Sequence, residues 1–457
     1  MDINFRKYIP ERITNRFGEK ENILVVLANT FWLVSDRVVR LGVALIVGAW
    51  VARYLAPENY GKLNYALAFV ALFGSFTSLG IDSILVRDIL TSPEKKDKLM
   101  GSAFRLKFMS GIVAYLASLL FIFLIKDEMR DRDTMLMISI MGIGNVFLAF
   151  DIIDLYFQSQ VKSKYTIFAK NYAFIIVSGI KVAMILCNAS LFLLSVTWLL
   201  EMVFSAAALV IIYEKRGFSI RKWSKEWSTM KYMVAQGFGF YISYISTFIY
   251  MKMDQIMIGD MMDNRAAGLY ASSTKLYEIP YTLLLIIGSS VYPSLINVYK
   301  VDKELFYRRI RQITTTLSMF GLIVIGSTWL LGAWVLNMLF GIEYNEAVEI
   351  LNIQIVGIYF MCLGVLRSSY LSIVSGQNVL MISTIFATIF NLLANFYLIP
   401  VMGAKGSALA TVITQFLSLV IINLFFEKTR RYFLMQAQSI LLLDVFNRLK
   451  KHLAPNI

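Results

Sequence analysis

Apolar residues along this chain gather in long stretches that are separated by short polar connections. About twelve such stretches occur between Ile23 and Phe426. A helix that crosses a membrane needs about 20 apolar residues, because each residue adds 1.5 Å to its length. The pattern predicts spans near residues 24–54, 61–82, 101–125, 134–157, 165–187, 190–213, 234–259, 268–297, 312–340, 345–374, 379–401 and 404–427.

The apolar stretches are typical of helices and not of membrane β-strands. They are longer than strands and lack the period-two alternation that an outer-membrane barrel requires. Within a bilayer, a helix satisfies all of its backbone hydrogen bonds internally. The sequence therefore predicts an all-α polytopic membrane protein.

The composition supports this class. Of the 457 residues, 58% are hydrophobic and 16% are charged, whereas about 25% are charged in a typical soluble domain. A soluble protein this apolar would expose hydrophobic patches far larger than soluble monomers tolerate. A membrane protein is therefore expected.

Lysine and arginine are distributed unevenly over the connections between the spans. Alternate connections, together with both termini, carry 28 of the 44 cations, the opposite connections carry 6, and 10 lie inside the spans. Loops rich in lysine and arginine stay in the cytoplasm, so both termini are expected there. The net charge of +14 is then explained by loops that face anionic lipid, and no nucleic-acid partner is expected.

A short repeat divides the chain into two halves. The segment 53–61 joins the first two spans, and the segment 263–268 joins the seventh and eighth; each ends in a glycine that opens the next helix. We expect two six-helix lobes of the same orientation, residues 1–213 and 234–427, a basic linker, 214–233, and a basic amphipathic tail, 428–457. Parallel repeats of this kind place a substrate site between the lobes.

Metal and histidine chemistry are not expected. The two cysteines, Cys187 and Cys362, lie far apart in apolar stretches, and the single histidine, His452, lies in the tail. No cofactor is expected either. A membrane-embedded glycosyltransferase would need a large loop with paired carboxylates, and no outer connection exceeds about ten residues. We therefore expect a protein that is not an enzyme.

Four stretches resemble polysaccharide biosynthesis transporters, the Wzx-type flippases of the multidrug/oligosaccharidyl-lipid/polysaccharide (MOP) exporter superfamily. The most specific is 391–411, in which Pro400, Gly403 and Gly406 precede a run of small residues. The other three are 53–61, Gly80–Arg87, and Lys252–Gly259 with Gly268–Tyr270 after it. The resemblance covers nearly the whole chain in order. One departure is Ala56, where the family usually has glycine before the proline.

The resemblance implies a MATE-like V of two lobes, alternately open to each side of the inner membrane of a bacterium. It implies that the protein flips an isoprenoid-diphosphate-linked oligosaccharide, such as an O-antigen or capsule repeat unit on an undecaprenyl-type carrier, to the outer leaflet. Membrane lipids are expected partners, and the glycan polymerase and chain-length machinery are further candidates.

Cations inside the spans are the candidates for binding the diphosphate, because a charge in the bilayer needs a polar cavity or a partner. Arg37 and Arg40 lie one turn apart in the first span, and their planar guanidinium groups suit phosphate oxygens. Lys252 and Arg367 are the candidates in the second half. An alternative for Arg37 and Arg40 is a charged cluster at the cytoplasmic end of the helix, partly neutralised by Asp36.

Carboxylates inside the spans are candidates for ion coupling or gating. Asp36 and Asp254 are the two considered. Lys252 and Asp254 are two residues apart and therefore point in different directions on their helix. Asp254 binds either a coupling ion or a lysine of another helix.

The remaining charges are expected to pair structurally. Lys275 with Glu278 and Lys181 with Glu201 are the principal pairs, and Lys170 is expected to pair with Asp151 and Asp154.

A cation-coupled multidrug exporter of the same superfamily is the alternative function. Such an exporter should present acids to its cavity, whereas a flippase for a diphosphate should present cations. Cations outnumber buried acids within the spans, which favours the flippase.

Overall fold

The computed structural model describes residues 21–122 and 131–440, with side chains described from Arg40 onward except at Pro293. Every regular element in these residues is a helix, so the prediction of an all-α protein is confirmed.

The first half of the chain forms one group of helices, in which the fourth predicted span is broken into short pieces around Gly142 and Gly144. Its elements are α2 (Glu21–Gly74), η2 (Ser75–Ser78), α3 (Asp82–Thr91), η3 (Pro93–Lys95), α4 (Lys96–Ile122), α5 (Arg132–Gly142), α6 (Gly144–Phe147), η5 (Leu148–Asp151), α7 (Ile152–Ser159), α8 (Lys164–Leu186) and α9 (Leu191–Lys215).

The second half forms a similar group, in which the tenth predicted span is also broken. Its elements are η6 (Ile220–Lys222), α10 (Trp227–Met261), α11 (Asn264–Val301), α12 (Lys303–Phe340), η7 (Ile342–Tyr344), α13 (Ala347–Gln354), α14 (Val356–Gly364), α15 (Arg367–Ile373), α16 (Gln377–Met402), α17 (Ala404–Leu419), η8 (Ile421–Leu424) and α18 (Glu427–Ile440).

Ten helical segments among the described residues are long and apolar enough to cross a membrane. One of them, Arg40–Thr91, includes two predicted spans, which meet at Ala56 and Pro57. Helix α10 is 35 residues long and is not among these ten segments. It corresponds to the predicted span that carries Lys252 and Asp254. The observed helices are therefore consistent with the twelve predicted spans.

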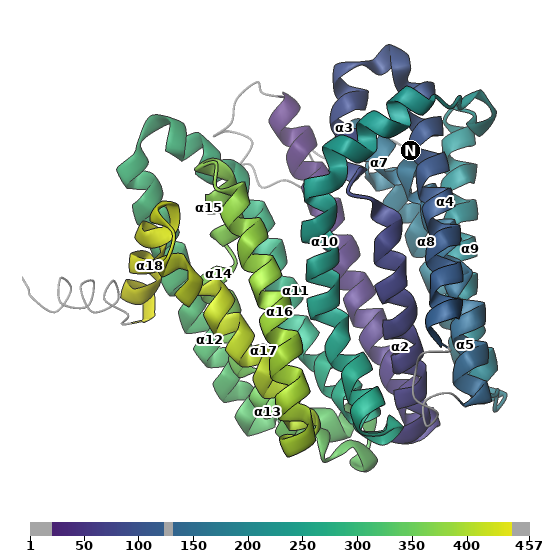
Figure 1. Cartoon of the computed structure of the whole chain (residues 1–457), viewed down its shortest axis with the longest axis vertical. Helices are drawn as coiled ribbons and strands as arrows, with labels where there is room; N and C mark the ends of the chain where they lie inside the picture. Colours follow the sequence, from purple (N-terminus) through teal and green to yellow (C-terminus); the bar gives the residue numbers. More distant parts are fainter. Residues whose placement is uncertain (1–20, 123–130, 441–457) are drawn as a thin grey trace, which may run out of the picture.

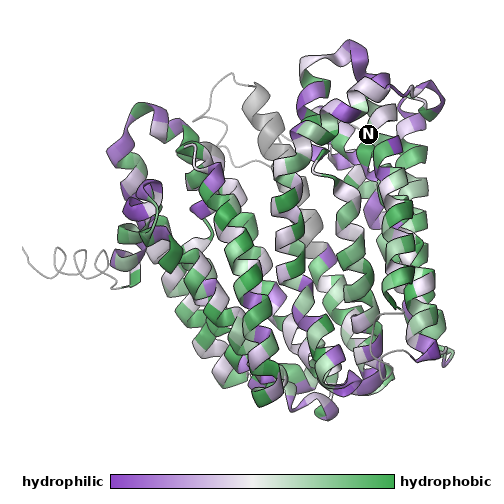
Figure 2. Cartoon of the chain, viewed as in Figure 1, coloured by the Kyte–Doolittle hydropathy of each residue, from purple (hydrophilic) through white to green (hydrophobic). Residues whose placement is uncertain are grey.

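Hydropathy follows the length of the helices. Figure 2 shows hydrophobic residues over the middle of the bundle and hydrophilic residues mainly at its two ends. Large apolar side chains are exposed on this middle zone, including Leu116, Trp334 and Leu393. Such a wide exposed apolar zone is expected where the surrounding medium is lipid and not water.

The two groups of helices form a V, which confirms the predicted architecture. In Figure 1 they converge at the end where α2 kinks and separate toward the opposite end, which we call the basic end because the lysine-rich connections lie there. The hydrophobic cores follow the same plan. One core contains residues of both lobes, whereas another lies entirely in the second lobe and a third lies in the first lobe with Met233 of α10.

The two repeated turns meet at the convergent end. A Cβ atom at Gly61 would overlap the carbonyl oxygen of Asn264, and one at Gly268 would overlap that of Pro57. The backbones of α2 and α11 can approach this closely only because both residues are glycine. Tyr344 adds a hydrogen bond of 2.7 Å from its hydroxyl to the carbonyl oxygen of Ala52.

Ala56, the residue where the resemblance led us to expect glycine, has φ 56°. This is the left-handed region that glycine adopts without steric cost. The backbone at the kink of α2 therefore has a conformation that suits glycine, although the residue is alanine.

The described part of the predicted tail is α18, which packs along α12. Tyr432 and Gln436 are fully buried, and the hydroxyl groups of Thr315 and Ser439 lie 3.0 Å apart. Residues 441–457 lie outside the described residues, so the interfacial position of the tail stays a prediction.

Candidate functional site

The first lobe contains the ion pairs that the sequence predicts. Nζ of Lys170 lies 2.8 Å from a carboxylate oxygen of Asp151 and 2.8 Å from one of Asp154. Nζ of Lys181 lies 3.4 Å from Oε2 of Glu201. These contacts connect α8 to η5, α7 and α9, so the charges of this lobe lie between its helices.

Two small cavities adjoin these pairs and share Glu201. One of about 170 Å³ is also lined by Arg40, Asp151 and Lys170. The other, of about 240 Å³, is lined by Lys181 and Tyr60 of the first lobe and by Lys275 of α11. The second cavity therefore has charged groups from both lobes.

Three charges of the second lobe lie near this cavity. Nζ of Lys275 is 3.6 Å from Oε2 of Glu278, as predicted. Lys252, half-buried on α10, interacts electrostatically with both residues. We call Lys181, Glu201, Lys252, Lys275 and Glu278 the interlobe charge cluster. It contains three cations and two acids, so its net charge is positive.

Asp254 lies in a separate polar site inside the second lobe and is 5% exposed. Its carboxylate accepts hydrogen bonds from Tyr270 Oη (2.8 Å), Asn395 Nδ2 (2.7 Å) and Thr411 Oγ1 (2.5 Å). Asn395 Nδ2 also donates to Oδ1 of Asn391 at 3.1 Å. The donors come from α11, α16 and α17, so four helices with α10 build this site.

The Asp254 site is made of neutral donors, and the lysine partner considered from the sequence is absent from the hydrogen bonds of this carboxylate. Carboxylate, amide and hydroxyl oxygens are ligands for hard cations. The described residues contain no group of three or more His, Cys, Asp or Glu side chains arranged to hold a metal ion. A carboxylate with amide and hydroxyl oxygens beside it has the chemistry to bind a proton or a hard cation.

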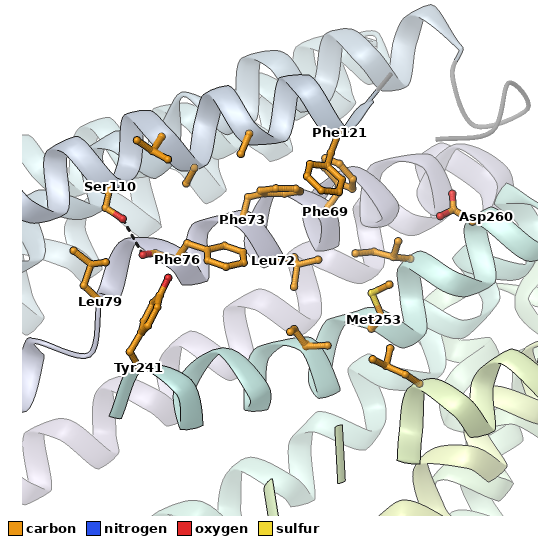
Figure 3. Close-up of a pocket in the computed structure, with 16 residues that line it drawn as sticks. Phe69, Leu72, Phe73, Phe76, Leu79, Ser110, Phe121, Tyr241, Met253 and Asp260 are labelled. Atoms are coloured by element: carbon orange, nitrogen blue, oxygen red, sulfur yellow. Dashed lines mark hydrogen bonds between the residues drawn. The ribbon is translucent and has the colours of Figure 1, made fainter. Parts of the chain in front are cut away.

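A larger cavity of about 1030 Å³ lies between α2, α4 and α10. Figure 3 shows Phe69 and Phe73 of α2 and Phe76 of η2 along it, with Phe121 of α4 beside them and Asp260 at one end. Its lining is mainly apolar: Phe69, Leu72, Phe73, Phe76, Leu79, Ser110, Val113, Ala114, Ala117, Phe121, Tyr241, Ile249, Met253, Ile256, Asp260 and Leu392.

The predicted substrate-binding arginines have different positions. The side chains of Arg37 and Asp36 lie outside the described residues. Arg40 places its guanidinium 5.2 Å from the ring centroid of Phe174 and lines the smaller cavity of the first lobe.

Arg367 is 3% exposed inside the second lobe. Its Nε donates to Oδ1 of Asn423 at 2.6 Å and its Nη1 donates to Oγ of Ser383 at 3.0 Å. Its Nη2 is buried without a hydrogen-bond partner among the described residues, so a contact between Arg367 and an anion stays a prediction.

Sequence reasoning gave no role to the partners of Asp254. Asn391 and Asn395 lie within the stretch that carries the resemblance and are four residues apart, which places them on one face of a helix. Two amides on one face inside a span are a usable signal, because polar groups in lipid need partners. The phenylalanines of the large cavity gave no signal, since lipid-facing helices have the same composition.

A family model described as "Polysaccharide biosynthesis protein" matches residues 50–349. The capsular polysaccharide biosynthesis protein CapF of Staphylococcus aureus is 21% identical over 392 residues, which cover 83% of this chain and 93% of CapF.

Two solved structures have a similar fold. The lipid II flippase MurJ in an inward closed conformation aligns with a TM-score of 0.70 and 15% identity, over 92% of this chain and 93% of MurJ. A multidrug resistance MATE family transporter of the MOP superfamily, in its inward-facing conformation, aligns with a TM-score of 0.69 and 14% identity, over 89% of this chain and 96% of that chain. The fold is therefore that of MOP-superfamily transporters.

Proposed function

Because this chain belongs to the polysaccharide biosynthesis protein family, we propose that it carries an isoprenoid-diphosphate-linked oligosaccharide across the membrane. The direction proposed is from the cytoplasmic to the outer leaflet of a bacterial inner membrane, with both termini cytoplasmic. The chain is a multi-pass membrane protein with a transporter fold, and the substrate and direction are the proposed part.

The interlobe charge cluster is the observation that carries the proposal. A diphosphate offers several anionic oxygens, and charge-assisted hydrogen bonds to such oxygens are the stronger ones. Lys252 and Lys275 lie on neighbouring helices of the second lobe, and Lys275 lines a cavity together with Lys181 of the first. An anion held by these lysines would be in contact with both lobes.

Contact with both lobes supports transport by alternating access. In parallel-repeat transporters, the substrate site lies between the halves, which rock about it. Here the lobes converge at the end opposite the basic end (Figure 1). A substrate that enters from the cytoplasmic leaflet would meet the charge cluster before the convergent contacts at Gly61 and Gly268 separate.

We assign ion coupling to Asp254. A carboxylate that is 5% exposed within a lipid-embedded lobe is costly when charged, so its charge state should respond to a bound proton or cation. Asp36 stays a second candidate, although its side chain lies outside the described residues.

The alternative function, export of organic cations, has one supporting observation. The large cavity combines phenylalanine rings with a carboxylate, Asp260, and aromatic faces attract cations. However, Asp260 already accepts a hydrogen bond of 2.9 Å from Tyr65. The net positive charge of the interlobe cluster also opposes a cationic substrate.

The proposal is tested by translocation in proteoliposomes. The substrate is a fluorescent lipid-linked oligosaccharide, and its arrival in the opposite leaflet is followed with a membrane-impermeant quencher. Lys252→Gln and Lys275→Gln are each expected to lower transport by about ten- to hundredfold, because each removes one hydrogen bond to a charged group.

Lys405→Gln is the matched control. Lys405 pairs with Glu349 at the convergent end of the V and does not line the cavity that Lys181 and Lys275 share. This variant should transport at the wild-type rate. Transport at the wild-type rate by both Lys252→Gln and Lys275→Gln would refute the role of the interlobe charge cluster. Failure of the wild type to move the glycolipid, together with uptake of a lipophilic cation that Asp260→Asn abolishes, would favour the exporter.

A further inference from the structure

We propose that the large cavity between α2, α4 and α10 holds the hydrocarbon chain of the lipid-linked substrate during transport. This inference rests on the function proposed above and adds a second subsite, for the isoprenoid chain, to the one for the diphosphate.

Almost all of the side chains that line the cavity are apolar. Three polar side chains occur among the lining residues, Ser110, Tyr241 and Asp260. Two of them are already engaged within the protein: Ser110 Oγ donates to the carbonyl oxygen of Phe76 at 2.9 Å, and Asp260 accepts from Tyr65. An apolar chain can therefore occupy the cavity without leaving these two groups unbonded.

A row of aromatic rings forms one wall. Phe69 and Phe73 of α2 and Phe76 of η2 follow one another along this wall, with successive ring centroids 5.0 Å and 6.2 Å apart. Phe121 of α4 adds a ring 5.5 Å from Phe73. Figure 3 shows this row between Leu79 at one end and Asp260 at the other. These neighbouring rings form an apolar wall, which suits a long, unsaturated chain that has to slide along it.

The cavity is continuous with the lipid-facing surface of the protein. Two of its lining residues on α4, Val113 and Phe121, are 65% and 48% exposed. They lie on the same exposed face as Leu116 and Leu120. A hydrocarbon chain in the bilayer can therefore enter sideways without crossing a polar surface.

The position of the cavity also fits an amphipathic substrate. Met253 lines the cavity and directly follows Lys252 of the charge cluster on α10. A lipid whose chain lies along the phenylalanines would therefore have its head group within about one turn of α10 from that lysine. The volume of about 1030 Å³ is at the upper limit of common small-molecule sites.

Filling the cavity should change the rate of transport more than the affinity of the protein for its lipid substrate. The chain of the lipid is already in hydrocarbon before it enters, so its transfer into the protein yields little hydrophobic free energy. What the cavity provides is space in which the chain can follow the head group. Filling this space should therefore slow long-chain substrates and leave short-chain substrates unaffected.

The experiment combines photolabelling and transport. A diazirine-bearing long-chain polyprenyl phosphate is crosslinked to the wild type in nanodiscs, and the labelled peptides are identified. Transport is compared for long-chain and short-chain lipid-linked oligosaccharides in Ala117→Trp, which fills the cavity, and in Ile175→Trp, which adds the same side chain to the exposed surface of α8, away from the cavity.

We expect labels on the α2 and α4 segments around Phe73 and Phe121. Ala117→Trp should lower long-chain transport by about tenfold, as overpacking commonly costs this much, with short-chain transport and the Ile175→Trp control near the wild-type rate. Labels confined to other helices would overturn the inference even if Ala117→Trp failed to fold, because labelling uses the wild type.

Two other results would overturn the inference. One is equal transport of both chain lengths by a well-folded Ala117→Trp. The other is displacement of the label by tetraphenylphosphonium that depends on Asp260, which would make the cavity an organic-cation site. If the wild type transports glycolipid but is labelled elsewhere, only the cavity assignment falls; if it transports none, the proposed function falls with it.

Discussion

The surroundings of Asp254 are the clearest residue-level feature that the structure adds to the sequence. Its carboxylate is buried in a lobe that lies in lipid, yet it accepts three hydrogen bonds from neutral side chains. Those bonds stabilise the charged form and hold its oxygens in place; binding of a proton or small cation there is the proposed part. Asn395 Oδ1 is a buried oxygen without a hydrogen-bond partner among the described residues, which leaves one further oxygen ligand at this site.

The first prediction concerns this carboxylate. Asp254→Asn removes the charge with almost no change in volume, so transport should continue while its dependence on an applied proton or sodium gradient is lost. The measurement is glycolipid translocation in proteoliposomes with and without each gradient. Asp260→Asn is the control, because it removes a carboxylate from the same helix outside this site. Unchanged gradient dependence in Asp254→Asn would exclude Asp254 from coupling.

The linker before α10 shows how one element is fixed to a lobe. Ser224 N donates to the carbonyl oxygen of Asp97 at 3.2 Å, and Nζ of Lys98 lies 2.6 Å from Oε1 of Glu226. Gly101 allows this contact, because a Cβ atom there would overlap the backbone of Ser224. The start of α10 is therefore tied to the first lobe, so movement between the lobes has to occur beyond residue 227.

The second prediction concerns the pH dependence of this attachment. Hydrogen bonds from Lys98 and Thr229 lower the pKa of Glu226 to about 2. A carboxyl group with a lowered pKa in the folded state contributes stability above its unfolded pKa and loses it as the pH falls through the folded value. The attachment should therefore persist at neutral pH and weaken as the pH falls from about 4.5 toward 2.

Amide hydrogen exchange in residues 219–226 measures this effect, with Glu226→Gln compared with the wild type at each pH. At pH 7 the variant should exchange about two- to fivefold faster, as exposed ion pairs are weak, and near pH 2 the two should be equal. Equal rates at pH 7 would show that the ion pair does not hold the linker.

The contact between the two repeats joins the lobes at one end of the whole molecule. Gly61 and Gly268 occupy equivalent places in the two halves and meet at the convergent end of the V. Hydrophobic residues of both lobes join in one core, whereas the second lobe keeps a core of its own. The stability of the closed end therefore depends on close packing of two backbones.

The third prediction tests this contact. Gly268→Ala places a methyl group against the carbonyl oxygen of Pro57, and overpacking of this kind costs about 1–3 kcal/mol. The lobes should separate at this end in a larger fraction of molecules. Spin labels on α2 and α11 would report longer distances between the lobes. Gly179→Ala is the control, because its methyl group meets no atom within 4 Å; identical distances in both variants would contradict the prediction.

Local patterns in the sequence were sufficient for the class and the plan of the protein. The length of each apolar stretch predicts a span, the lysine-rich connections define one end, and a repeated turn indicates two similar halves. These properties depend on neighbouring residues and on the bilayer, so a sequence without coordinates reveals them. The pairs Lys275–Glu278 and Lys181–Glu201 were also predictable, because their members lie on one helix or on adjacent helices.

The tertiary structure alone decided which polar groups meet and where space remains. Asp254 is hydrogen-bonded to Asn395 and Thr411, which lie 141 and 157 positions further along the chain. Arg367 donates hydrogen bonds to Ser383 and Asn423, which come from two other elements. The large cavity is invisible in the sequence, because side chains that face lipid and side chains that line a cavity for a lipid chain are equally apolar. Only the packing of α2, α4 and α10 distinguishes the two.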